Sequence, residues 1–223
     1  MNIPADLSMD ELIKLLDNKV KSELPIVYKM FTFTSKTELY IEQIITAFLK
    51  VIQHEHMKDF MIYLVKELIS NAIKANTKRI YFDEKGLNLN NVDDYWKGMA
   101  TFKEETVKNS EYYARKQEEK GLYIEFSIQR INKIITIEMK NNVKITNIEE
   151  KRIKNKIKQG KKYIVLEDAA TDAIDTTEGY GLGLIILMLL MKKMGIKGKL
   201  KIQKEEKLTG ICIKLKKLQN NGT

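Results

Sequence analysis

Glu178-Gly179-Tyr180-Gly181-Leu182-Gly183-Leu184 is the stretch that decides the fold, and the apolar run 185–191 follows it directly. Glycines at alternate positions let a backbone approach a bulky ligand closely. The helix predicted after them points its unsatisfied N–H groups and the positive end of its dipole toward that place. This arrangement favours a phosphate-binding site. It is neither a Rossmann fingerprint, because Leu184 stands where a third glycine is needed, nor a Walker loop, because no Gly-Lys-Ser/Thr occurs.

A second polar motif lies upstream, in Glu67-Leu68-Ile69-Ser70-Asn71-Ala72-Ile73-Lys74-Ala75. Apolar spacing predicts a helix over 57–76, and Glu67, Asn71 and Lys74 recur on one face of it at i, i+4 and i+7. The carboxylate could deprotonate a nucleophile, the amide oxygen could bind Mg²⁺, and the ammonium could meet phosphate charge. The same row is also typical of a solvated polar face with a Glu–Lys pair, and the helix alone leaves both interpretations open.

Together the two motifs resemble the GHKL ATPase superfamily, the Bergerat ATP-binding fold. Glu67-x-x-x-Asn71-Ala72-x-Lys74 resembles its N box, and Gly179-x-Gly181-x-Gly183-Leu184 resembles its second glycine box. The resemblance covers residues 26–218. It implies an α/β two-layer sandwich, with a mixed, largely antiparallel sheet and helices on one face, and it implies ATP and Mg²⁺ as cofactors.

The resemblance also implies a role for each matching residue. Glu67 would be the catalytic residue that orients or deprotonates the acceptor, Asn71 the Mg²⁺ ligand and Lys74 a phosphate contact. Where the first glycine box is expected, Asn141 replaces the Asp that reads adenine and Val143 replaces a glycine. The remaining nucleotide-binding positions are Gly179, Gly181, Leu182, Gly183, Leu184 and, on the closing strand, Thr209.

The entry to the fold resembles one branch of the superfamily. A strand over 27–34 and a capping box formed by Ser35 and Glu38 precede a helix predicted to end near Val51. This order resembles the bacterial anti-sigma-factor serine kinases. Histidine-kinase catalytic domains share the boxes, but a complete histidine kinase needs a phosphoacceptor hairpin well upstream of the N box. His54 and His56 lie too close to Asn71 to leave room for one.

The remaining pattern predicts the organisation of the chain. Residues 1–25 form a helical appendage opened by a capping box at Ser8, and residues 26–218 form the ATP-binding domain. The other expected segments are a strand at 79–83, a helical insertion at 84–120, a hairpin of 122–129 and 134–139, a basic helix at 147–159, a lid at 168–177, a helix at 182–194, strands at 199–204 and 210–216, and a polar tail at 219–223.

Composition narrows the class of protein. The apolar run after the glycines is too short to cross a bilayer, which takes about 20 residues, and no signal peptide is evident. The lone Cys212 excludes an intramolecular disulfide and favours a reducing compartment, so we expect a cytoplasmic protein without a membrane partner. A net charge of +9, with a basic block at 151–162, could attract an acidic protein, a nucleotide or nucleic acid.

Three functions remain open at this point. The first is an ATP-dependent protein kinase acting on a separate signalling partner such as a sigma factor, an antagonist or a receiver domain. The second is a nucleotide-gated module that sequesters a partner without catalysis. The third is a basic nucleic-acid-associated protein, which the absence of aromatic interleaving and of a recognisable reading module disfavours. A homodimer is compatible with each.

Overall fold

The computed structural model describes residues 3–4, 7–163, 182–205 and 208–216 of the 223-residue chain. Its elements, in chain order, are α1 (Met9–Lys21), β1 (Ile26–Met30), α2 (Ser35–Val51), the 3-10 helix η1 (Glu55–Met57), α3 (Lys58–Glu84), α4 (Val92–Lys108), α5 (Ser110–Glu119), β2 (Ile124–Ile131), β3 (Ile134–Asn141), α6 (Asn147–Lys162), α8 (Leu182–Lys193), β4 (Lys197–Lys204) and β5 (Thr209–Lys216).

The five strands form one sheet in the order β1-β2-β3-β5-β4, and every pairing in it is antiparallel. The α/β class is therefore confirmed. The mixed sheet that we expected is not what the described strands form, because none of them pairs in parallel. Ile137 at the centre faces Ile128 on one neighbour and Ile213 on the other, so one face of the sheet is a continuous apolar surface.

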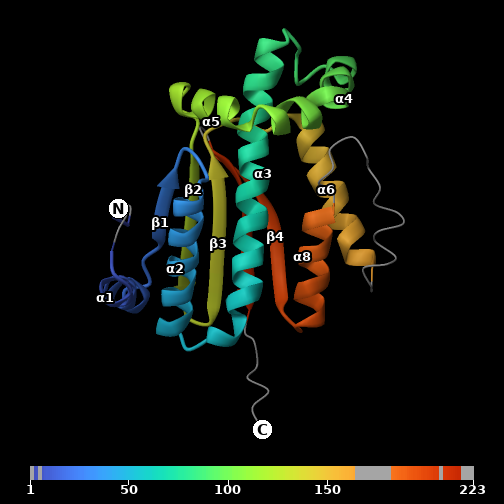
Figure 1. Ribbon diagram of the computed structural model, residues 1–223. Helices are drawn as coiled ribbons and strands as arrows, with labels where there is room; N and C mark the ends of the chain where they lie inside the picture. Colours follow the sequence, from blue (N-terminus) through green and yellow to red (C-terminus); the bar gives the residue numbers. More distant parts are fainter. Residues whose placement is uncertain (1–2, 5–6, 164–181, 206–207, 217–223) are drawn as a thin grey trace.

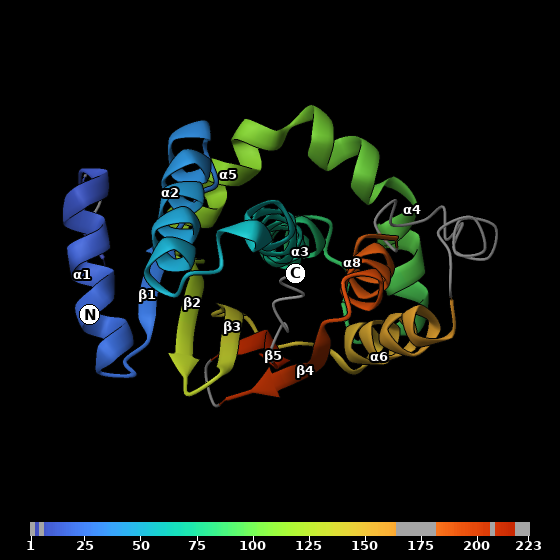
Figure 2. The same cartoon turned by 90° about the horizontal axis from the view of Figure 1, so that it is seen from below.

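Helices cover that apolar face. Figures 1 and 2 show α2, α3 and α8 on the same side of the sheet, with α3 across its middle. Buried side chains of these helices and of the sheet form one core, and Leu12 and Leu16 of α1 join it from the side. The molecule is thus a two-layer sandwich in which α3, the helix that carries Glu67 and Asn71, packs directly on β3.

The strand expected at 79–83 is wrong, because α3 continues through these residues to Glu84. Ile80, Tyr81 and Phe82 favour a strand by composition. In the structure all three are at most 1% exposed, because α4 and α5 surround this end of α3 and bury it from several sides. Tertiary packing therefore outweighs local propensity here, and the helix stops only before Gly86, whose φ is +63°.

The expected helical insertion is formed by α4 and α5, which build a second apolar cluster on the end of α3. Its buried members are Ile80, Tyr81, Phe82, Tyr95, Met99, Phe102 and Tyr113. Gly98 lets α4 approach closely, since a Cβ atom there would stand 2.5 Å from the Phe82 ring. The two clusters share α3, so one helix belongs to both.

The sequence predicted the first residues of some helices more accurately than those of others. The capping box at Ser8 is present in both directions, with Glu11 as its partner. For α2, the N-cap is Thr34, which accepts from the backbone N–H of Thr37, and not Ser35, so that capping box is wrong by one residue. β1 also ends at Met30, four residues earlier than expected.

The remaining predicted elements among the described residues are confirmed with small shifts in their ends. These are the hairpin of β2 and β3, the basic helix α6, the helix α8 after the glycines, and the final strands β4 and β5. The lid at 168–177 and the tail at 219–223 lie outside the described residues. Among the helices that the structure describes, none has the length and apolar character needed to cross a membrane.

Candidate functional site

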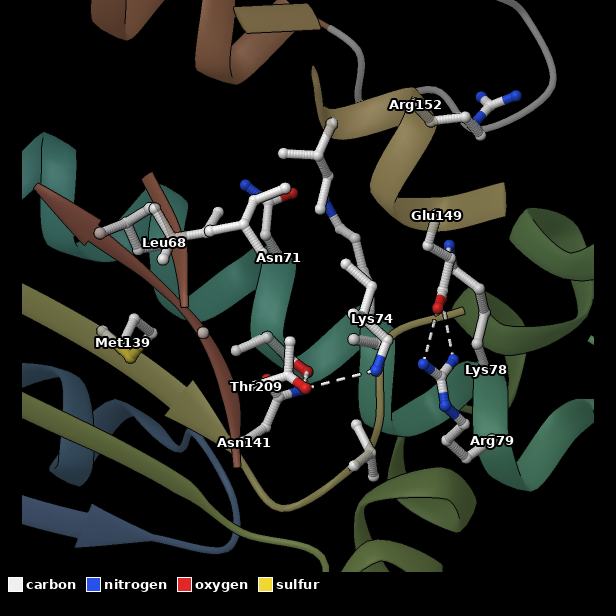
Figure 3. A pocket seen from close by; sticks show the side chains of 18 of the residues that line it. Leu68, Asn71, Lys74, Lys78, Arg79, Met139, Asn141, Glu149, Arg152 and Thr209 are labelled. Carbon is white, nitrogen blue, oxygen red and sulfur yellow. Dashed lines mark hydrogen bonds and ion pairs between the residues drawn. The ribbon is translucent and has the colours of Figure 1, made fainter. Parts of the chain in front are cut away.

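A cleft of about 150 Å³ opens between α3, the ends of β3 and β5, and helices α4, α6 and α8. Five residues singled out in the sequence line it: Asn71, Lys74, Asn141, Leu184 and Thr209. Figure 3 shows the polar members of this set around one cavity, although they come from three separate parts of the chain. Its inner wall is apolar and includes Met139, Ile153 and Ile211. A cleft with this wall and a few convergent polar groups is typical of a ligand site.

Asn71 and Glu67 form a pair on one face of α3. The Nδ2 of Asn71 donates to Glu67 Oε1 at 2.9 Å, which leaves the Asn71 Oδ1 atom as a neutral oxygen ligand. Burial raises the pKa of the Glu67 carboxyl, and the Asn71 hydrogen bond and the Lys74 charge offset this only partly. Because a base works best when its pKa approaches the operating pH, the raised value suits a proton acceptor.

Glu67 does not line the cleft itself. It lines a neighbouring cavity on the other side of α3, together with Ser70, Ile73 and Thr77, and Lys74 lines both cavities. The carboxylate therefore lies at the boundary between two spaces. A group in that position can act on an atom that approaches from the far side of the helix.

The first turn of α8 closes over Glu67. A Cβ atom at Gly183 would lie 1.9 Å from Glu67 Oε1, so only a glycine fits beside the carboxylate in its present rotamer. The contact joins the two motifs that the sequence places more than 100 residues apart. It also gives a reason for the glycine at position 183, which is the close approach of the Glu67 side chain. The sequence had suggested a different reason, the close approach of a phosphate group.

Asn141 ends β3 and is 6% exposed. Its Nδ2 donates to the Ala72 carbonyl at 3.3 Å and to Asn76 Oδ1 at 3.1 Å, which fixes the amide orientation because a backbone carbonyl can only accept. The Oδ1 atom of Asn141 accepts no hydrogen bond from the residues that the structure describes, and Asn141 lines the cleft. An acceptor is therefore available to a ligand, held in place by α3.

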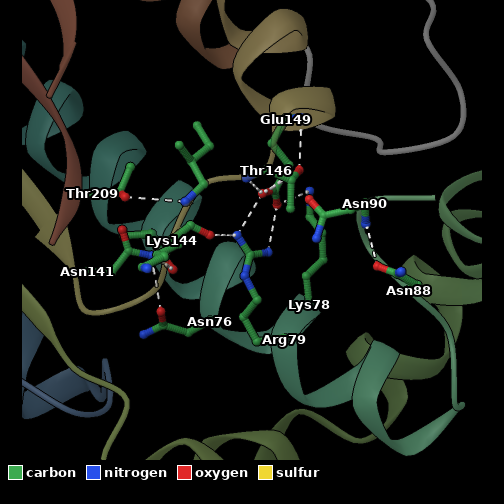
Figure 4. Close-up of polar contacts among 12 residues, drawn as sticks. Asn76, Lys78, Arg79, Asn88, Asn90, Asn141, Lys144, Thr146, Glu149 and Thr209 are labelled. Atoms are coloured by element: carbon green, nitrogen blue, oxygen red, sulfur yellow. Dashed lines mark hydrogen bonds and ion pairs between the residues drawn. The ribbon is translucent and has the colours of Figure 1, made fainter. Parts of the chain in front are cut away.

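Thr209 starts β5 opposite Asn141 in the sheet. Its hydroxyl oxygen accepts from the backbone N–H of Ile145 at 3.3 Å, so the hydroxyl proton is left to donate elsewhere. This contact ties the loop after β3 to the closing strand (Figure 4). The part of the cleft beside β3 and β5 therefore carries one acceptor, on Asn141, and one hydroxyl, on Thr209.

Sequence reasoning missed an ion-pair network at the outer end of the cleft. Arg79 donates to both carboxylate oxygens of Glu149, at 2.8 and 2.6 Å, and to the Lys144 carbonyl at 2.7 Å (Figure 4). Lys78 Nζ lies 3.7 Å from Glu149 Oε1. Burial acts to raise the pKa of Glu149, but Arg79 and Lys78 outweigh it and hold that pKa at about 2. The network fixes the start of α6 against α3.

Tyr95 of α4 lines this end of the cleft, and its neighbour Trp96 contacts the cleft residue Arg152. The Arg152 guanidinium carbon lies 5.9 Å from the centroid of the Tyr95 ring and 5.2 Å from that of Trp96, and Lys78 lies 5.8 Å from Tyr95. Arg152, Lys78 and Arg79 all line the cleft with Lys74. Lys74 and Lys78 are one helical turn apart, so their spacing could have predicted that both lie on the face of α3 that borders the cleft. The incorrect prediction of a strand at 79–83 ended the helix too early, so this face was not predicted to continue past Asn76.

The other predicted site residues lie elsewhere. Leu182 packs against Tyr163, Ile185 and Leu189 in a small apolar cluster beside α8. Gly179 and Gly181 lie outside the described residues. Within the part of the chain that is described, no group of three or more His, Cys, Asp or Glu side chains is placed to hold a metal ion. A protein-bound cation here would therefore rely on a neutral oxygen such as that of Asn71 and on its ligand.

Comparison with known proteins places the sequence beside one relative without a described activity. An uncharacterized protein of Treponema pallidum (strain Nichols) is 41% identical over 177 residues, which are 79% of this chain and 34% of the relative. The chain thus spans about a third of that protein's length. No family model matches the chain, and no solved structure matches it.

Proposed function

We propose that this chain binds ATP with Mg²⁺ in the cleft beside α3 and acts as an ATP-dependent protein kinase on a separate signalling protein. The observation that carries the proposal is the convergence of Asn71, Lys74, Asn141 and Thr209 on one cavity. They are residues for which the sequence motifs predict contacts to a single nucleotide. The finer assignment of the fold, as a histidine-kinase-like ATPase of the GHKL superfamily, is part of this proposal.

The residues suit the ligand in detail. Adenine stacks against the apolar wall with its amino group on the Asn141 Oδ1 atom, and the Thr209 hydroxyl donates to the ring. The Asn71 oxygen is one hard ligand for a Mg²⁺ ion that otherwise relies on phosphate oxygens and water. Lys74 offsets phosphate charge. Charge stabilisation of this kind, together with positioning of the reactants, is what phosphoryl transfer mainly needs from a protein.

Glu67 takes the catalytic role in this proposal. Its carboxylate lies at the boundary between the nucleotide cleft and the cavity behind α3, so an acceptor hydroxyl can reach it from the side that ATP does not occupy. Its raised pKa suits the acceptance of a proton from that hydroxyl. The partner is a regulatory protein, such as a sigma factor, an antagonist or a receiver domain, and we propose that the reaction takes place in the cytoplasm.

One observation favours a second function, a nucleotide-gated binding module without catalysis. Val143 lines the cleft where the superfamily has a glycine, and both donor contacts of Asn141 are used to hold α3. A neutral amide also binds the adenine amino group more weakly than a carboxylate does. Under this alternative the chain binds ATP and its partner but leaves the partner unphosphorylated, which separates the two functions directly.

Trp96 provides a direct test of nucleotide binding. It is the only tryptophan, it is 47% exposed, and it lies against Arg152, which lines the cleft. We expect Mg²⁺-ATP to change its fluorescence, with saturation, and to raise the melting temperature. A ligand at about 100 times its Kd adds about 2.7 kcal/mol of apparent stability. No fluorescence change and no thermal shift at millimolar ATP would show that the nucleotide assignment is wrong.

Asn71→Ala tests the metal role separately. We expect the variant to lose the Mg²⁺-dependent part of ATP affinity, because its single protein oxygen ligand is removed. Titration of ATP with Mg²⁺ and with EDTA, followed by Trp96 fluorescence, measures that part for both proteins. Ser70→Ala is the matched control, since Ser70 neighbours Asn71 on α3 but lines the other cavity. Equal Mg²⁺ dependence in Asn71→Ala and wild type would remove Asn71 from the site.

A further inference from the structure

The net charge of the chain is concentrated on two elements. Helix α6 carries seven Lys or Arg residues against two Glu residues, and β4 carries four Lys residues and no acidic residue. Their combined excess of nine positive charges equals the formal net charge of the whole chain, which is +9. The rest of the sequence therefore carries no net charge, and the excess positive charge of the chain lies on these two elements.

α6 and β4 lie on the same side of the molecule, as Figures 1 and 2 show. A groove runs between them with an aliphatic floor of Ile157, Leu200 and Ile202, all half-buried. Its rim includes Lys154, Lys201 and Lys204, together with Glu150, which forms ion pairs with Lys154 and Lys204. The surface combines apolar and cationic groups, which suits a polypeptide better than a phosphate backbone alone. Neither α6 nor β4 contains an aromatic residue on which a nucleic-acid base could stack.

β4 is also the outermost strand of the sheet on this side, so its outer backbone edge is not paired with another described strand. The outward face of β4 and β5 brings like charges together, because Lys197 faces Lys216 and Lys199 faces Lys214 across the ladder. Directly opposed like charges destabilise a sheet. Lysines on an edge strand also disfavour the pairing of two identical edges, and therefore a β4-to-β4 homodimer.

We propose that the outer edge of β4 is the docking site for an acidic β-strand of a partner protein. Side chains alternate between the two faces of a strand, and the two faces of this edge differ. On the outer face, acidic side chains would meet Lys199 and Lys201 and relieve the repulsion between opposed lysines. On the helical face, apolar side chains would cover Leu200 and Ile202. Main-chain hydrogen bonds give such complexes their affinity, and the alternating pattern gives specificity.

Ile202 lines both this groove and the candidate nucleotide cleft, but the inference does not depend on the proposed activity. The test uses a fluorescent eight-residue peptide of alternating glutamate and valine, followed by anisotropy with the full chain. We expect saturable binding that weakens with salt. Lys199→Glu/Lys201→Glu should weaken it by at least about tenfold, because like charges replace attractive ones. Lys14→Glu/Lys58→Glu, which changes the net charge equally at exposed sites outside this flank, should leave it unchanged.

Two further probes separate strand addition from simple attraction of charge. A peptide with the same residues in two blocks, and an alternating peptide with N-methyl groups along one edge, should each bind at least about tenfold more weakly, because each loses the register or the backbone donors. Equal binding of either probe, or no binding of the alternating peptide, would overturn the proposal. A single-stranded oligothymidylate is the probe for nucleic acid. If it binds more tightly than the alternating peptide, and if Lys199→Glu/Lys201→Glu abolishes that binding, the flank is a nucleic-acid site instead.

Discussion

Glu149→Ala is expected to lower the free energy of unfolding by about 3–5 kcal/mol, because it leaves two largely buried cations without their shared anion. Arg79 and Lys78 are 18% and 12% exposed, and both face the Glu149 carboxylate. The variant also removes the glutamate of the capping box at the start of α6. Equilibrium denaturation in urea, at one salt concentration for all variants, measures the loss.

Glu104→Ala is the control for this result. Glu104 also pairs with a lysine, at 2.6 Å from Lys108, but both side chains are about 70% exposed. Exposed pairs of this kind contribute about 0–1 kcal/mol. A loss in Glu149→Ala no larger than in Glu104→Ala would show that the network at the cleft is not a structural support.

The same carboxyl gives the stability a defined pH dependence. Its pKa is lowered from the ordinary value of 4.5 to about 2, so its stabilising contribution is present above pH 4.5 and is lost as the pH falls toward 2. A shift of this size corresponds to about 3 kcal/mol. Wild type should therefore lose more stability than Glu149→Gln over that window, because the amide does not titrate.

Glu67→Gln is expected to reduce phosphoryl transfer by a factor of about 10²–10⁴, the usual contribution of a general base, while ATP affinity stays close to that of wild type. The amide keeps an oxygen for the Asn71 donor but cannot accept a proton. Transfer of ³²P from labelled ATP to proteins in an extract of the source cells, beside ATP titration by Trp96 fluorescence, measures both quantities.

Gly183→Ala tests the role of Glu67 by changing the residue that packs against its carboxylate. A Cβ atom there would overlap the Glu67 carboxylate, which is the movable end of a long side chain, so we expect the carboxylate to rotate away from Asn71. Transfer should fall as in Glu67→Gln, with little loss of stability. If transfer persists at the wild-type rate in both variants, Glu67 is not the base. ATP binding by wild type without any transfer to a partner would instead favour the binding module.

Much of the fold was predictable because local signals agreed with the final packing. Alternating apolar residues predicted the hairpin of β2 and β3, and its buried residues do face the helices. The i, i+4 spacing of Glu67 and Asn71 predicted a shared face, and their side chains are hydrogen-bonded. The meeting of Asn141 and Thr209 was not a local signal. It came from the resemblance, which supplied the order of the strands.

What the sequence could not provide depends on contacts between distant segments. Ile80, Tyr81 and Phe82 look like a strand until α4 and α5 are placed around them. Arg79 and Glu149 are 70 residues apart, and no pattern within either segment pairs them. Thr34 and Ser35 are both good caps, and only the path of the chain out of β1 selects the first.

Because α3 is shared by two apolar clusters, the walls of the cleft belong to different clusters. Asn141 and Thr209 are anchored in the sheet, whereas Tyr95, Met99 and Phe102 belong to the smaller cluster of α4 and α5. Units with fewer buried contacts open at a lower free energy than the whole protein. Opening of the smaller unit alone would remove one wall of the cleft and leave Asn141 and Thr209 in place, so a ligand in the cleft would gain a route out without global unfolding.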